Sequence, residues 1–191
     1  MRHVPTIEQT IAFINTIHHG QERRDGKPYV SHPIAVMELL PKAASMDAKL
    51  AALLHDTLEK SHKFPRQGET EIRPVTREEL GRMGYSDRTI RAVELTSKIE
   101  GIGVYREGMS YLEWINAIIK TDDLDTMQVK YADMLHNTDP QSLEALSTIT
   151  RDDGQNEADY RRDKYKMPMI LLRRELERAD LLEMTKGRSA A

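Results

Sequence analysis

The chain has 191 residues, of which 39% are hydrophobic and 31% charged, with a formal net charge of -3 and a mean hydropathy of -0.61. No apolar run is long enough to span a membrane, the start lacks the apolar core of a secretory signal, and the net charge argues against non-specific nucleic-acid binding, so we expect a cytoplasmic globular protein. The absence of cysteine excludes disulfides, thiolate metal sites and cysteine nucleophiles. Any metal site must therefore use histidine and carboxylate ligands, which favours Mn, Mg, Fe or Zn.

Helical patterns dominate the first third of the chain. The segment 21–29 is polar, carries glycine and proline, and is predicted to be a locally basic loop. Residues 61–75 lose the apolar period and are predicted to form an extended loop. The expected helices run from a Thr6 cap to about His19, from a Ser31 cap over Ile34 to about Ala44, and from an Asp47 cap through Glu59.

The remaining pattern is also helical. Pro140 ends one helix, and Pro168 should kink or split the C-terminal one. No strand-like alternation or repeat stands out, so the expected fold is an all-α, compact multi-helix bundle, one domain over residues 1–191 with a helical tail from about 156. The expected helices follow a Thr76 capping box to Gly84, then cover Ser86 to Ser97, Ser110 to Lys120, Leu124 to Asn137 and 156–186.

Two polar motifs interrupt apolar helical runs. His55 and Asp56 follow the run 50–54, and a carboxylate inside a core-facing helix must be paired, hydrogen-bonded or bound to a metal. On a continuous helix His55 and Glu59 would share a face, so that Glu59 could reach over an ion held by His55 and Asp56. The alternative is a core histidine beside a hydrogen-bonded aspartate. A later helix places Asp133 and Asn137 four residues apart on one face.

The ordered pattern of His32, then His55-Asp56, then Asp133 resembles the HD phosphohydrolase superfamily. The surrounding sequence resembles the alarmone-hydrolase domain of the RelA/SpoT family and its small stand-alone relatives, whose alarmone is the guanosine polyphosphate (p)ppGpp. The resemblance covers roughly residues 18–137, and residues 160–172 are also similar. The segments that carry it are HHGQERR at 18–24, GKPYVSHP at 26–33, AALLHDTLE at 51–59 and VKYADMLHN at 129–137.

The resemblance implies a Mn²⁺-type ion held by His32, His55, Asp56 and Asp133, with Glu59 helping to activate or position water. Such an ion activates water and neutralises phosphate oxygens, so that hydrolysis proceeds at neutral pH. The implied reaction is removal of the 3′-pyrophosphate of (p)ppGpp. The implied partner is a phosphorylated nucleotide, while the sequence gives no oligomeric state.

The resemblance also implies substrate contacts. Asn137 would orient a substrate hydroxyl or phosphate, while Tyr29 could line the pocket. Arg23, Arg24 and Lys27 would meet negative charge, since the planar guanidinium can grip two phosphate oxygens. Where the family usually has a second acid after the glutamate, this chain has Lys60, which could pair with Asp56 or point at a phosphate.

Two further hypotheses stay open. Lys60 and the altered run 138–141 are compatible with hydrolysis of another nucleotide or phosphoester, and the absent acid is compatible with a weakly active module that binds a nucleotide or neutralises a partner. Single residues also have simpler explanations. Glu59 could pair with Lys63, Asn137 could be a helix C-terminal residue, Arg23 and Arg24 could be solvated, and Tyr111 and Trp114 are expected in the core rather than in a base-stacking platform.

Overall fold

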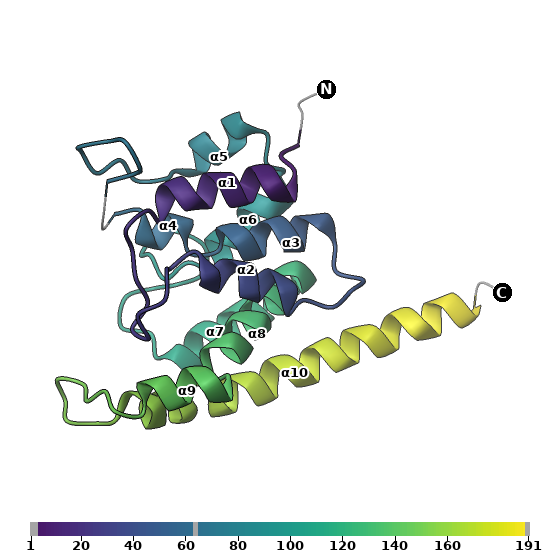
Figure 1. The fold of residues 1–191 in the computed structure, drawn as a ribbon. Coiled ribbons are helices and arrows are strands. Elements are labelled where there is room, and N and C mark those ends of the chain that lie inside the picture. Colours follow the sequence, from purple (N-terminus) through teal and green to yellow (C-terminus); the bar gives the residue numbers. More distant parts are fainter. Residues whose placement is uncertain (1–3, 63–64, 190–191) are drawn as a thin grey trace.

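The computed structural model describes residues 4–62 and 65–189, with side chains described as far as 180. Within these residues there are helices and two isolated β-bridges but no β-strand, which confirms the all-α prediction. The helices are α1 (Ile7–Ile17), α2 (Ser31–Glu38), α3 (Met46–Leu54), α4 (Thr57–Lys60), α5 (Arg77–Met83), α6 (Asp87–Thr96), α7 (Tyr111–Ile119), α8 (Leu124–Asn137), α9 (Pro140–Leu146) and α10 (Glu157–Ser189) (Figure 1).

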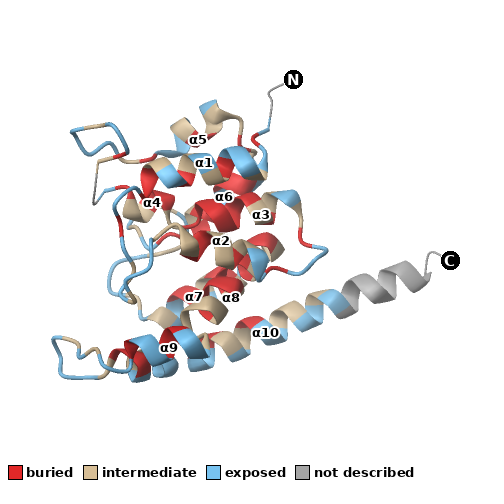
Figure 2. Ribbon diagram, viewed as in Figure 1, coloured by how far each residue is buried: buried red, intermediate tan, exposed pale blue. Residues whose placement is uncertain are grey.

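Helix α3 lies at the centre of the main hydrophobic core. It contacts α1, α2, α6 and α8, and its C-terminal half is buried (Figure 2). Five consecutive residues, from Leu50 to Leu54, are fully buried. An amphipathic helix would bury only one face, so this all-round burial explains why the run 50–54 is continuously apolar.

Helix α8 connects two hydrophobic clusters. Val129 and Ala132 belong to the core around α3, whereas Met127 and Met134 belong to a second cluster that α7 and α10 complete with Trp114 and other residues. Figure 1 shows α8 between α2 above and α10 below. The polar residues Lys130 and Asp133 of this helix are therefore buried between the two clusters.

Two of the four predicted caps, Thr6 and Thr76, are confirmed. Thr6 and Ser110 form capping boxes, and Ser86 accepts from the backbone of Thr89. Thr76 also caps its helix, but the predicted capping box is absent because the Glu79 carboxylate binds the Arg66 guanidinium at 2.6 and 2.7 Å instead.

Two predicted caps were wrong. Helix α2 begins at Ser31 itself, whose hydroxyl donates to the carbonyl of Pro28, and it ends at Glu38 rather than near Ala44, because Pro41 disfavours helical conformation in the residue before it. Helix α3 is capped by Ser45 and not by Asp47. The Asp47 carboxylate instead accepts hydrogen bonds from two hydroxyls at the start of α6.

The predicted continuous helix through Glu59 is interrupted at His55 and Asp56. The His55 Nδ1 atom donates to the carbonyl of Ala52 at 2.8 Å, and the Thr57 hydroxyl donates to the carbonyl of Leu54 at 2.7 Å. These side chains take carbonyl groups that a continuing helix would use, so α3 ends and the short α4 follows. The expected face shared by His55 and Glu59 is therefore absent.

The C-terminal third differs from prediction in two ways. Pro140 does not simply end a helix, because it is also the first residue of α9, where its missing N–H is harmless and Asp139 supplies the cap. Pro168 does not split α10, which is continuous from Glu157 and contacts α7, α8 and α9. None of the helices in the described part of the chain is long and apolar enough to cross a membrane. The single-domain organisation stays a prediction.

Candidate functional site

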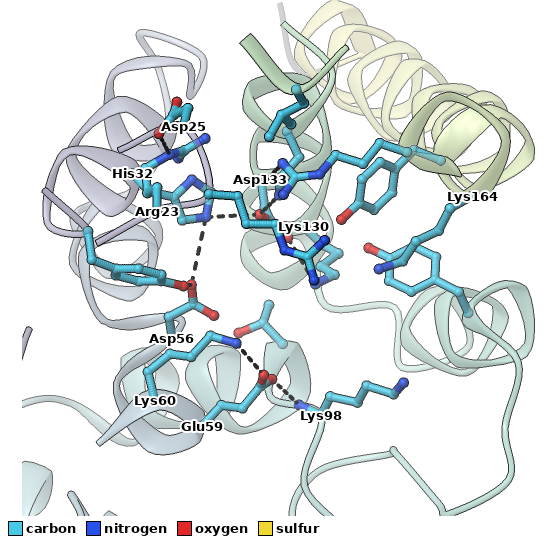
Figure 3. Close-up of a pocket in the computed structure, with 18 of the residues that line it drawn as sticks. Arg23, Asp25, His32, Asp56, Glu59, Lys60, Lys98, Lys130, Asp133 and Lys164 are labelled. Atoms are coloured by element: carbon cyan, nitrogen blue, oxygen red, sulfur yellow. Dashed lines mark hydrogen bonds and ion pairs between the residues drawn. The ribbon is translucent and has the colours of Figure 1, made fainter. Parts of the chain in front are cut away.

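A pocket of about 520 Å³ opens where α2, α4, α7, α8 and α10 meet. Its volume lies in the range of small-molecule sites. Figure 3 shows His32 and Asp56 on one side, Asp133 and Lys130 at the back, and Lys98 and Lys164 on the opposite side. The pocket therefore has one end built from histidines and carboxylates and another that is cationic.

The first end is a compact cluster of ligand atoms. One atom each from His32, His55 and Asp133 lies within 4.8 Å of the others. The Asp133 Oδ1 atom is 3.2 Å from His32 Nε2 and 3.9 Å from His55 Nε2. The Asp56 Oδ2 atom is 3.7 and 3.4 Å from the same two nitrogens. The four predicted metal ligands thus come together from three separate segments of the chain.

His55 is well suited to bind a divalent ion. Because its Nδ1 atom donates to a backbone carbonyl, the other ring nitrogen is left to face the cluster. That Nε2 atom is buried and has no hydrogen-bond partner among the described residues. Burial lowers the pKa of His55, but Asp56 and Asp133 outweigh it and raise the pKa to about 9. The cluster therefore favours a positive charge, which a bound divalent ion would supply.

The two carboxylates are held in their ionised form. Burial opposes ionisation of Asp133, but Lys130, whose Nζ atom is 3.0 Å from Oδ2, and the two histidines hold its pKa well below the usual range. Burial likewise opposes ionisation of Asp56, while His55 and other nearby cations hold its pKa far below normal. Anionic oxygens and imidazole nitrogens in one cluster match the ligands of Mn, Fe or Zn.

His32 contacts a second imidazole. Its Nδ1 atom is 2.7 Å from His136 Nδ1, and the two rings stack with centroids 5.0 Å apart. The Arg23 Nη1 atom is 3.2 Å from the same nitrogen of His136. Burial, together with the neighbouring His32 and Arg23, lowers the pKa of His136 to about 4, so this ring is neutral at pH 7.

The opposite end of the pocket is rich in cations. Within the described residues, the ammonium groups of Lys98 and Lys164 form no ion pair, although both residues line the pocket. Lys164 lies 4.6 Å from the ring centre of Tyr111 and 4.9 Å from that of Tyr165. Burial and the nearby Lys130 lower the pKa of Lys164 to about 8. This wall can bind phosphate groups that lie away from the histidine cluster.

Known proteins resemble this chain over most of its length. A guanosine-3′,5′-bis(diphosphate) 3′-pyrophosphohydrolase of Borreliella burgdorferi is 27% identical over 135 residues, and one of Haemophilus influenzae is 28% identical over 123 residues. A GTP pyrophosphokinase rsh of Brucella melitensis is 31% identical over 166 residues. The chain is related to the RelA/SpoT-type alarmone hydrolases. No model of a protein family matches it.

The matches include only a small part of each RelA/SpoT-type relative. They cover 69%, 63% and 84% of this chain, but only 18%, 16% and 20% of the three relatives, respectively. The chain thus spans a fifth or less of each. What those names state about activity belongs to the relatives.

Glu59 and Lys60 pair with each other, and among the described residues Lys60 forms no ion pair with Asp56, which was one of the two alternatives for it. The Glu59 carboxylate accepts from Lys60 Nζ at 2.6 Å and from the backbone N–H of Lys98 at 3.3 Å (Figure 3). Both residues nevertheless line the pocket. The proposed alternative partner of Glu59, Lys63, lies outside the described residues. The water-activating role of Glu59 stays a prediction.

Asn137 and Tyr29 hold carboxylates. The Asn137 amide donates to Asp133 Oδ1 at 2.6 Å, and its own oxygen accepts from Arg161 at 3.3 Å. The Tyr29 hydroxyl donates to Asp56 Oδ2. Both residues line the pocket, so the predicted substrate contacts are compatible with these hydrogen bonds. In this structure they orient the two aspartates.

The three basic residues of the loop 21–29 differ in how close they lie to the pocket. Arg23 is mostly buried and contacts Asp25 at 3.3 Å as well as His136, whereas Arg24 is half-exposed and pairs with Glu157 at the start of α10. Both line the pocket, while Lys27 is exposed and is not among the lining residues. Substrate binding by these three residues stays a prediction, and the structure does not bring Lys27 to the pocket.

Several pocket residues were missed by the sequence analysis. They are Lys98, Lys130, Arg161 and Lys164, and His136, which contacts His32 behind the pocket lining, was also missed. The position of Lys130 three residues before Asp133 is a helical pairing that could have been recognised. Lys98 and Lys164 come from distant segments, and their convergence has no local signal. Trp114 lies in the core as predicted, yet it also lines the pocket, with Lys130 Nζ 4.2 Å from its ring centre.

Proposed function

We propose that this chain is a metal-dependent phosphohydrolase that releases pyrophosphate from a guanosine polyphosphate of the (p)ppGpp type, with Mn²⁺ as the expected metal. The observation that carries this proposal is the convergence of His32 Nε2, His55 Nε2 and Asp133 Oδ1 within 4.8 Å, beside Asp56, at one end of a pocket. The names of the relatives support the guanosine 3′-pyrophosphate as substrate.

The charge distribution of the pocket supports a substrate with more than one phosphate group. The histidine cluster would hold the metal next to the scissile phosphate. Lys98, Lys164 and Arg161 line the wall across the pocket, where they would bind a phosphate group at another position of the same molecule. A small nucleotide fits this enclosed site better than a nucleic-acid strand, and the cytoplasm stays its expected location.

In the proposed reaction, different residues would bind the ion, orient its ligands and bind the substrate. His32, His55, Asp56 and Asp133 would hold the ion. When bound, a divalent ion supplies a Lewis acid that polarises a phosphoryl oxygen and makes water a better nucleophile. Tyr29 and Lys130 keep the aspartates oriented through hydrogen bonds to their carboxylates. Lys98, Lys164 and Arg161 would hold the other phosphate group, which fixes the position of the substrate relative to the ion.

One observation favours a second candidate, a hydrolase of another nucleotide or phosphoester. The Glu59 carboxylate is paired with Lys60 at 2.6 Å, so the group expected to act on water is partly neutralised. This pairing also suits the third hypothesis, a weakly active module that binds a nucleotide or neutralises a partner. The three alternatives differ in which substrates they turn over.

The decisive experiment is product analysis with the purified full chain, stripped of metal and reloaded with Mn²⁺. The substrates are ppGpp, GTP, GDP and ATP, and the readout is pyrophosphate together with the nucleotide product. We expect GDP and pyrophosphate from ppGpp alone. Asp133→Asn, which removes a charged ligand atom at constant size, should lower the rate by about 100-fold or more, since even outer-shell changes cost up to that much.

The matched control is Asp159→Asn, the same chemical change at an exposed residue of α10 whose one ion pair within the described part of the chain is with Arg162. This variant should hydrolyse ppGpp at the normal rate. Cleavage of another substrate but not ppGpp would favour the second candidate. Binding of ppGpp without turnover under any divalent metal would contradict the enzymatic proposal and favour a binding module.

A further inference from the structure

His136 lies one turn after Asp133 on α8 and contacts the face of His32 that points away from the cluster. The two Nδ1 atoms are 2.7 Å apart, and the rings are nearly parallel, with 27° between their planes. A hydrogen bond of this length needs one donor and one acceptor. In a neutral imidazole, one nitrogen donates and the other accepts.

Arg23 decides which of the two nitrogens carries the proton. Its Nη1 atom is 3.2 Å from His136 Nδ1, and a guanidinium group only donates hydrogen bonds. The His136 Nδ1 atom must therefore be an acceptor. Asp25 holds this arginine through a contact of 3.3 Å to its Nε atom. The proton between the two rings consequently belongs to His32 Nδ1.

This assignment leaves His32 Nε2 as the nitrogen that faces the cluster, where it can give its lone pair to a bound ion. His55 has the same arrangement, because its Nδ1 atom donates to the carbonyl of Ala52. The two histidines thus present the same nitrogen, but His55 relies on a backbone carbonyl and His32 relies on a side chain. Only the second of these can be removed by substitution.

We propose that His136 is a positioning residue that fixes His32 in the Nδ1–H tautomer and orients its Nε2 atom toward the metal. The inference rests on the proposed function to the extent that it assumes a divalent ion at the cluster. Ring nitrogens of metal-binding histidines are commonly fixed in this way by an acceptor behind them, and loss of that acceptor typically weakens metal binding 10- to 100-fold.

The test uses the full chain and measures Mn²⁺ affinity by isothermal titration calorimetry, independently of turnover. His136→Leu removes the acceptor and should weaken Mn²⁺ binding by about 10- to 100-fold. His136→Gln supplies an amide oxygen as acceptor and should restore most of the affinity. His19→Leu, at an exposed histidine, is the matched control and should bind Mn²⁺ like the unchanged chain. Far-UV circular dichroism checks that each variant folds.

Nitrogen-15 NMR of the histidine rings provides a second measurement that does not depend on the variants. In the unchanged chain, both metal-free and loaded with diamagnetic Zn²⁺, His32 should carry a proton on Nδ1. A His32 ring protonated only on Nε2 would overturn the proposal, and so would a folded His136→Leu variant with undiminished Mn²⁺ affinity. Failure of a folded His136→Gln variant to recover affinity would also count against it.

If the proposed metal-dependent function is wrong, the experiments give a different result from a failure of the His136 proposal. In that case the unchanged chain would bind no divalent metal, whatever residue stands at 136. The tautomer of His32 in the metal-free chain would still decide whether His136 acts on it as proposed. The two results therefore separate the positioning role from the presence of a metal site.

Discussion

At the residue scale, the two oxygens of Asp133 have different tasks. Oδ2 accepts from the buried ammonium of Lys130, whereas Oδ1 faces His32 and accepts from Asn137. A buried carboxylate without such partners would be protonated or displaced. Lys130 itself stacks above Trp114. One ion pair therefore keeps the oxygen that is proposed to bind a metal charged in the interior of the protein.

Lys164 yields a pH prediction at this scale. Its pKa is lowered to about 8, so the amine is charged at pH 7 and largely neutral at pH 9. Binding of inorganic pyrophosphate to the metal-free chain should therefore weaken over this range. Lys164→Arg keeps its charge throughout, so its profile reports only the titration of the ligand and of other groups. Calorimetric profiles of the same steepness for both proteins would contradict the prediction.

At the scale of elements, the interruption between α3 and α4 creates the site. His55 and Asp56 leave the helical pattern where side chains capture the last carbonyls of α3. The two functional groups then point into one cluster. On a continuous helix they would be displaced from each other by about 100°. Helix α8 supplies Asp133 from the other side.

Thr57 tests this interpretation of the helix end. It is fully buried, and its hydroxyl donates to the carbonyl of Leu54. Thr57→Val keeps the shape but leaves that carbonyl without its side-chain donor, so we expect a loss of about 1–2 kcal/mol in the free energy of unfolding. Thr57→Ser retains the hydroxyl and serves as the control. Equal urea midpoints for the valine variant and the unchanged chain would show that this bond does not maintain the break.

At the scale of the whole molecule, the pocket joins segments that are far apart in the sequence. The loop before α2 is tied to α10 by Arg24 and Glu157, and Glu157 also binds Arg151 and Arg161. Glu157 is buried, and its removal would take the ion-pair partner from Arg24 and Arg161, whereas Arg151 would keep Asp153. This network closes the pocket between the first and last parts of the described chain.

A bound metal should stabilise the whole fold, because its ligands come from α2, the α3–α4 junction and α8. At a free Mn²⁺ concentration about 100 times the dissociation constant, the stabilisation is about 2.7 kcal/mol. For a domain of this size, that corresponds to a rise in melting temperature of roughly 5–10 °C. Calorimetric scans with Mn²⁺ and with EDTA measure the difference. Asp133→Asn should show little of it, and an equal rise in that variant would place the metal elsewhere.

The all-α fold and the caps at Thr6 and Thr76 followed from the sequence, because apolar periodicity and capping residues are local signals. The set His32, His55, Asp56 and Asp133 came from the resemblance of separated motifs to a known family. Only the tertiary structure decided four other features of the site. They are the break at His55, the pairing of Glu59 with Lys60, the contact between His32 and His136, and the lining of the pocket by Lys98 and Lys164. Each depends on side chains that meet across separate helices or compete with the backbone for a carbonyl. Such contacts are set by packing, which no single segment of sequence encodes.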